Sequence, residues 1–147
     1  MSIILQIFHI ISQNNSSSRV NTCSSIARGI TQSKESNTKR MTNIIEFTRE
    51  NFRNKISIED ISAIANLSSS AFCRYFKKEK DKNYTDYVNE LRIMYASNLL
   101  KSTEISVTQI VYESGFENPS HFFSLFKKIT KKTPLQYRKI QTEMNLK

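Results

Sequence analysis

The sequence predicts an all-α fold of about seven helices from residue 41, with two helix-turn-helix units joined by a long helix. From Met41 onward, apolar residues recur at helical spacing, and no segment alternates as a strand does. The chain has only two glycines and two prolines, so few positions interrupt a helix. A motif is also repeated: Phe72-x-x-x-Phe76-Lys77-Lys78 returns as Phe122-x-x-x-Phe126-Lys127-Lys128. Two copies favour a pair of helix-turn-helix units over a solenoid.

The chain before Met41 is different in character. Residues 2–12 form a stretch that would be apolar on nearly every side of a helix, which predicts a helix buried against a partner. It is either the remnant of a preceding domain or an element that joins two copies into a homodimer. Residues 13–40 are polar and serine-rich, and we expect a linker with a short helical piece at about 24–30. No membrane span or export signal is indicated, so we expect a cytoplasmic protein.

The first predicted unit begins with a helix at about 41–53. Ser57 is expected to cap the next helix, whose inward residues include Ile58 and Ile61. Asn66 lies at the tight turn, where a positive φ is expected. Ser68 then caps the first recognition helix, at about 68–79.

A spacer helix from Tyr84 to Leu100 follows, with Leu91 and Tyr95 among its inward residues. It contains no glycine or proline, so we expect it to be rigid and to fix the two units relative to each other. We expect the helices of the second unit at about 106–114, 118–129 and 134–142. Gly115 takes the place of Asn66 at the turn. Residues 143–147 are left as a tail.

The charge favours a polyanionic partner, because 22 Lys and Arg against 13 Asp and Glu give a net charge of +9. The sequence has no Ser-His-Asp constellation and no glycine-rich phosphate loop. We therefore expect that the protein is not an enzyme and that it has no catalytic residue and no cofactor. Cys23 and Cys73 lack metal-ligand spacing, so we expect no metal site.

Several motifs of the second half of the chain occur together and in a fixed order: Leu91-Arg92, Ala96, Leu99-Leu100, Tyr112-Glu113-Ser114-Gly115-Phe116, Ser120, Phe122, Phe126-Lys127-Lys128 and Thr133-Pro134-x-x-Tyr137-Arg138. With the repeat, they resemble the AraC/XylS family of bacterial transcription regulators over about residues 41–140. The resemblance implies a double helix-turn-helix DNA-binding domain at 41–142 that places one recognition helix in each of two adjacent major grooves of promoter or operator DNA. It also implies an activator that contacts RNA polymerase. Residues 1–40 resemble only the end of the family's N-terminal domain, as in a truncated chain or a short member.

Four positions depart from the family's pattern. Asp81 and Lys131 replace the glycine that usually follows each recognition helix, so each residue either takes a left-handed conformation or ends its helix differently. Val111 stands where a small alanine is common. Ser124 stands where many members have arginine, which weakens base reading by the second recognition helix.

The recognition-helix faces opposite the phenylalanines are the predicted DNA contacts. Arg74 is the best candidate for reading a base, because a guanidinium can bridge guanine O6 and N7, although a phosphate contact is the alternative. Phe123 either packs on thymine methyl groups or belongs to the core. The predicted base-reading residues are Ser69, Ser70, Cys73, Arg74, Ser120, His121, Phe123 and Ser124. The predicted phosphate-binding residues are Lys77, Lys78, Lys127, Lys128, Lys131 and Lys132.

Two other functions compete with this prediction. A helical protein-interaction module would use the same helices, but it would not need basic residues beside each recognition helix. A DNA-binding protein without sequence readout would need the basic residues alone.

Overall fold

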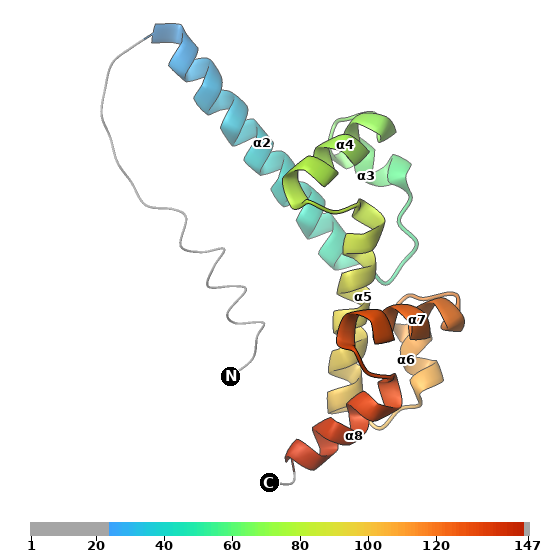
Figure 1. Ribbon diagram of the computed structural model, residues 1–147. Helices are drawn as coiled ribbons and strands as arrows, with labels where there is room; N and C mark the ends of the chain where they lie inside the picture. Colours follow the sequence, from blue (N-terminus) through green and yellow to red (C-terminus); the bar gives the residue numbers. More distant parts are fainter. Residues whose placement is uncertain (1–23, 146–147) are drawn as a thin grey trace. The chain divides into compact units, whose positions relative to one another are not determined.

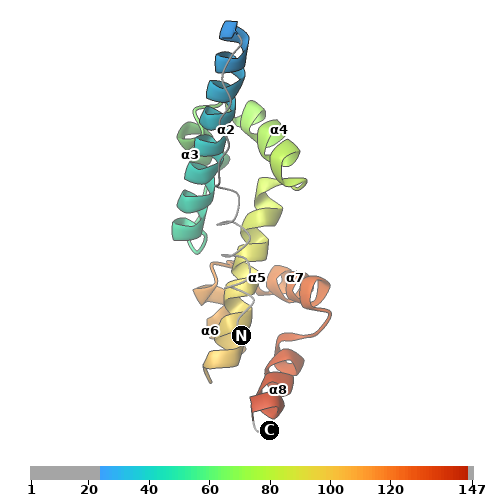
Figure 2. The same cartoon turned by 90° about the vertical axis from the view of Figure 1, so that its left-hand side faces the viewer.

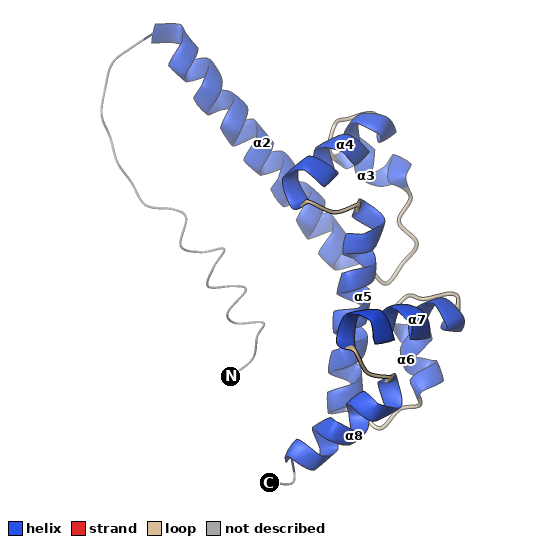
Figure 3. Cartoon of the chain, viewed as in Figure 1, coloured by secondary structure: helices blue, strands red, loops and turns tan. Residues whose placement is uncertain are grey.

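The structure is a computed structural model that describes residues 24–145 (Figure 1). A division at Ser36 separates the chain into two parts, and every contact described below lies within Ser36–Lys147. The described residues form seven helices and no strand, which confirms the predicted all-α fold (Figure 3). The helices are α2 (Ser24–Asn51), α3 (Ile58–Ile64), α4 (Ser69–Lys80), α5 (Tyr84–Ser102), α6 (Val107–Glu113), α7 (Pro119–Thr130) and α8 (Pro134–Asn145). The apolar stretch 2–12 and residues 13–23 lie outside the described residues.

Helix α2 begins much earlier than the sequence predicts. The helix expected from residue 41 starts at Ser24, so it includes the short helical piece expected at about 24–30 and continues without a break through residues 31–40. Their polar composition is typical of a linker, but helix propensity is a weak signal that tertiary contacts override. Here the Arg40 Nε donates a hydrogen bond to the Ala65 carbonyl at 2.8 Å. The Tyr75 hydroxyl donates to the Asn37 carbonyl at 3.2 Å. Both contacts stabilise the last turns of the segment against the first helix-turn-helix unit.

The first unit consists of α3 and α4 packed on the C-terminal half of α2. Its core contains the fully buried side chains of Ile44, Ile61, Phe72 and Phe76. The rings of Phe72 and Phe76 both pack edge to face with the Tyr84 ring of α5, and each centroid lies 5.2 Å from that of Tyr84. The repeated phenylalanines are therefore core residues, four positions apart on one helix face.

The second unit consists of α6, α7 and α8. Phe122 and Phe126 are fully buried, as their counterparts in the first unit are. Tyr137 of α8 packs edge to face on Phe126 at 5.6 Å. The Arg138 guanidinium donates a 2.7 Å hydrogen bond to the Ile105 carbonyl, which joins α8 to the start of the unit.

Helix α5 runs from the first unit to the second, as two views of the fold show (Figures 1 and 2). Tyr84 and Val88 belong to the core of the first unit. Ile93, Ala96 and Leu100 belong to the core of the second. The helix therefore buries different faces along its length. Leu91 and Tyr95, which were expected to be inward, are only partly buried.

Candidate nucleic-acid interface

The two helix-turn-helix turns have the same backbone geometry. Asn66 has a φ of 57° and Gly115 a φ of 82°, so both predicted left-handed positions are confirmed. In each turn, the residue after this position donates a backbone hydrogen bond to the helix before it. Leu67 N donates to Ser62 O at 2.9 Å, and Phe116 N donates to Val111 O at 3.2 Å. The turns thus set the start of both recognition helices in the same way.

Side chains cap both recognition helices, and Ser68 does so as predicted. Ser68 accepts a hydrogen bond from Ala71 N at 3.4 Å, at the start of α4. Asn118 accepts from His121 N at 3.2 Å, at the start of α7, where Pro119 holds the first position. Ser57 likewise caps α3 through Asp60 N at 3.0 Å. These caps stabilise the helix ends that lead into the outward faces.

The outward face of α4 carries most of the predicted base-reading residues of the first unit. Ser70, Cys73, Arg74 and Lys77 are exposed. Ser69 differs from the prediction, because it is only partly exposed and its Oγ lies 3.4 Å from Ser62 Oγ of α3. Its short side chain faces the preceding helix, a packing relation that helical spacing alone does not reveal.

The outward face of α7 presents a mixed polar and aromatic surface. Ser120, His121 and Ser124 are exposed. Phe123 is 43% exposed. Its ring packs edge to face with the Phe122 ring, with 5.5 Å between the ring centroids. Of the two alternatives for Phe123, the structure favours the surface over the core. The His121 ring packs against the Phe116 ring, with 5.8 Å between the ring centroids. This contact orients the imidazole at the N-terminal end of α7.

The lysines predicted to bind phosphate are all exposed, and they lie near the C-terminal ends of the two recognition helices. They are Lys77, Lys78, Lys127, Lys128, Lys131 and Lys132. Asp81 and Lys131 end the helices with left-handed φ values of 54° and 61°, which decides between the two alternatives left open by the missing glycines. Lys131 N also donates to Lys127 O at 2.9 Å, so the helix closes despite the left-handed residue.

Helices α4 and α7 lie on the same side of α5. In Figure 2 both are to the right of α5, while α3 and α6 are to its left. Two helices on the same side of a third can enter two recesses on one face of a ligand.

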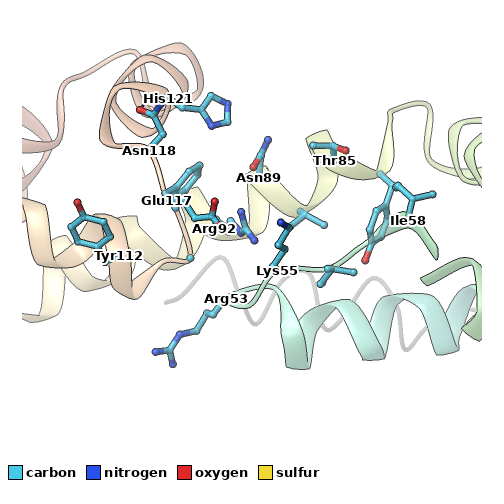
Figure 4. A pocket seen from close by; sticks show the side chains of 15 residues that line it. Arg53, Lys55, Ile58, Thr85, Asn89, Arg92, Tyr112, Glu117, Asn118 and His121 are labelled. Carbon is cyan, nitrogen blue, oxygen red and sulfur yellow. Dashed lines mark hydrogen bonds between the residues drawn. The ribbon is translucent and has the colours of Figure 1, made fainter. Parts of the chain in front are cut away.

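A pocket of about 720 Å³ is lined by residues of both units (Figure 4). Lys55, Asn89, Arg92 and His121 contribute polar groups to it, and Glu117 is an acidic group on its wall. Burial lowers the pKa of Arg92, an effect that neighbouring Glu117 and Tyr84 oppose. No motif in the sequence marks Lys55 or Asn89, because the two residues lie in different elements and only the fold brings them together.

Within residues 24–145, no three His, Cys, Asp or Glu side chains gather where they could hold a metal ion. The helices of the same region include none that is both long and apolar enough to cross a membrane. Cys73 is a free, exposed thiol, and Cys23 lies outside the described residues.

Comparison with known proteins identifies the double unit. A family model described as a helix-turn-helix domain matches residues 61–140. The chain is 35% identical over 111 residues to a Bacillus subtilis (strain 168) protein named as an uncharacterized HTH-type transcriptional regulator, YdeC, covering 76% of this chain and 38% of that protein. It is 30% identical over 115 residues to the HTH-type transcriptional activator RhaS of Enterobacter sp. (strain 638), covering 78% of this chain and 40% of that one.

A solved structure is also similar to this chain and is likewise that of a transcriptional regulator. The chain is similar to a transcriptional regulator from Chromobacterium violaceum described as AraC-type DNA-binding domain-containing, with a TM-score of 0.66 and 27% identity. This similarity covers 71% of the present chain and 93% of that chain. The chain spans about two fifths of the length of the two curated relatives, since it covers 38% and 40% of them.

Proposed function

The chain belongs to the AraC/XylS family of transcription regulators, and we propose that it binds a specific DNA sequence by placing α4 and α7 in two adjacent major grooves. One observation carries the proposal. Both recognition helices carry exposed polar and basic residues, and both helices lie on the same side of α5 (Figure 2). A duplex offers successive major grooves about 34–36 Å apart along one face, one for each helix.

Arg74 is the principal base-reading residue in this proposal. Its side chain is exposed in the middle of the outward face of α4, and no hydrogen bond or ion pair among the described residues engages it. A free guanidinium on a recognition helix is able to donate two parallel hydrogen bonds to guanine O6 and N7. Ser70 and Cys73 flank it and would contact neighbouring base edges or a thymine methyl group.

Helix α7 contributes a different kind of readout. It carries no arginine or lysine in its first half, where Ser120, His121 and Ser124 are the exposed polar groups. Phe123 offers an apolar surface suited to a thymine methyl group. We therefore assign hydrogen-bonded base reading mainly to α4, and methyl contacts, shape and phosphate anchoring to α7.

The remaining parts of the proposal concern the whole protein. We propose that residues 41–142 are the DNA-binding domain, that residues 1–12 pair two copies of the chain or end a further domain, and that the protein acts in the cytoplasm without catalytic activity. The relative RhaS is named as an activator. By analogy, we propose activation of transcription, which would bring the DNA-bound chain into contact with RNA polymerase.

The test is selection of bound sequences from a randomised DNA pool, followed by fluorescence-anisotropy titrations of the selected and scrambled DNA. We expect enrichment of two sequence blocks about 10–10.5 base pairs apart, centre to centre. Arg74→Ala should lower affinity for the selected site by about 1–3 kcal/mol and relax one base position. Arg74→Lys, which keeps the charge but loses the planar fork, should lose the base preference and retain more of the affinity.

Two results would count against the proposal. A steep salt dependence without any enriched sequence would support non-specific DNA binding, one of the competing functions. Absence of binding at low salt would favour the protein-interaction module. If enrichment occurred but Arg74→Ala kept the wild-type ratio of selected to scrambled affinity, the assignment of Arg74 alone would be wrong.

A further inference from the structure

Two segments far apart in the sequence meet between the helix-turn-helix units. Arg53, in the loop after α2, belongs to the first unit. Its Nε donates to the Glu113 main-chain carbonyl at 3.0 Å, and its Nη2 lies 2.9 Å from Glu113 Oε2 at the end of α6. Its guanidinium also lies over the Tyr95 ring of α5, 5.3 Å from the centroid. One side chain thus connects the first unit, the second unit and the helix between them.

The backbones of the two units also touch at this place. Gly115 forms the turn of the second unit. A Cβ atom added there would lie 2.8 Å from Arg53 Cα and closer still to the Arg53 carbonyl oxygen. Such an approach excludes every side chain, so glycine here serves contact between the units as well as a left-handed φ.

Arg92 makes the third connection, from the middle of α5. It lies between Val88, in the core of the first unit, and Ile93, in the core of the second. Its Nε donates to Phe52 O at 2.7 Å and its Nη2 donates to Asn54 O at 2.9 Å. Its guanidinium also lies 5.7 Å from the centroid of the Phe116 ring in the second unit. Figure 4 shows Arg92 between Lys55 and Glu117.

We propose that this junction, formed by Arg53, Arg92 and Gly115, fixes the distance and rotation between α4 and α7. These three residues would then be positioning residues that decide which spacing between two DNA blocks is bound. The two units pack on different stretches of α5, and a long helix curves gently even where nothing kinks it. The junction adds contacts on the side of α5 where the loop after α2 meets the turn of the second unit. The inference rests on the proposed function.

DNA offers a sensitive measure of that geometry. One inserted base pair turns the second block by about 35° and moves it by about 3.4 Å, because a turn contains 10–10.5 base pairs. For the wild-type protein, we expect one inserted or deleted base pair between the selected blocks to lower affinity by about tenfold or more, the scale of a mismatched base pair. In Arg53→Ala and Arg92→Ala, the ratio of the affinities for the optimal and the altered spacing should fall to about threefold or less. This holds even if affinity for the optimal site also falls.

The Lys82–Glu90 ion pair offers a matched control. Lys82→Ala removes this pair, whose charged atoms are 2.7 Å apart and whose side chains are partly exposed, as those of Arg53 and Glu113 are. This pair does not connect the two units. Lys82→Ala should therefore keep the wild-type ratio of affinities for the optimal and the altered spacing.

A second measurement needs no DNA. Spin labels on Cys73 of α4 and on an introduced Leu135→Cys of α8, in a Cys23→Ser background, report the distance between the units. Both positions are exposed. We expect a narrow distance distribution in the wild-type background and a broader one with Arg92→Ala. Circular dichroism and thermal melting show that each variant is folded.

The outcomes separate the inference from the proposed function. Failure to select any sequence would reject the proposed function, while the spin-label distances would still test the junction. If folded Arg53→Ala and Arg92→Ala proteins kept both the narrow distance distribution and the wild-type spacing ratio, α5 alone would hold the units and the inference would be wrong.

Discussion

Thr48 and Tyr84 share a buried hydrogen bond between α2 and α5, with 2.8 Å between Thr48 Oγ1 and Tyr84 Oη. Thr48 also donates to the Ile44 carbonyl at 2.6 Å. Because the threonine hydroxyl has a single proton, the tyrosine must be the donor in the shared bond. The Tyr84 hydroxyl therefore has one specific partner inside a core that is otherwise aromatic and aliphatic.

Tyr84→Phe should lower the free energy of unfolding by about 0.5–1.5 kcal/mol, because it removes this hydrogen bond without opening a large cavity. Urea denaturation at neutral pH measures the change. Thr48→Val tests the same bond from the other side, but also removes the bond to Ile44. Equal stability of the wild type and Tyr84→Phe would mean that the buried bond contributes nothing net.

Alkaline pH should destabilise the fold through the same residue. Burial raises the pKa of Tyr84 above its ordinary value of 10.0, and the pKa values of Tyr75 and Tyr87 are raised in the same direction by burial. The unfolded chain then loses these protons first as the pH rises. Stability is complete below about pH 10 and falls above it. Unfolding titrations between pH 8 and 11, values chosen about the ordinary tyrosine pKa, should show a shallower fall for Tyr84→Phe.

The two turn residues should respond differently to exchange. Asn66→Gly should change stability by less than about 1 kcal/mol, because both residues tolerate a left-handed φ. Gly115→Asn should be clearly destabilised, because its Cβ would meet the Arg53 backbone even though asparagine tolerates the φ. Thermal unfolding of the two variants gives the comparison. Similar melting temperatures for both would show that the close approach relaxes without cost.

The lysines at the end of α7 should determine the salt dependence of DNA binding. Replacing both Lys127 and Lys128 by alanine should reduce the slope of log affinity against log salt by about 2, roughly one for each phosphate contact. The loss should be similar for selected and scrambled DNA. Lys39→Ala, an exposed lysine of α2 outside both recognition helices, is the control and should leave the slope unchanged. An unaltered slope in the double variant would remove these lysines from the interface.

The sequence predicts the local features of the fold well. Ser57, Ser68 and Asn118 cap the expected helices, and Asn66 and Gly115 take the expected left-handed turns. Such features depend on a few neighbouring residues, so they can be read from spacing and residue type alone.

Features that depend on distant contacts are not visible in the same way. The start of α2 at Ser24 was missed because serine and asparagine suggest a linker. Ser69 was placed on the outward face, although its hydroxyl lies near Ser62. Arg53 resembles any surface arginine in the sequence, and only the fold brings it to Glu113. The assignment of DNA contacts to particular exposed side chains stays a prediction.

The sharing of α5 between two cores has a consequence for how the domain folds. Tyr84 and Val88 complete one core, and Ile93, Ala96 and Leu100 complete the other. If either core melts, α5 loses packing along half its length, and the junction at Arg92 loses its partners. The two halves therefore form one cooperative folding unit, and heat or denaturant should unfold them in a single transition. Although the repeat marks two units in the sequence, we expect them to unfold together because they share α5.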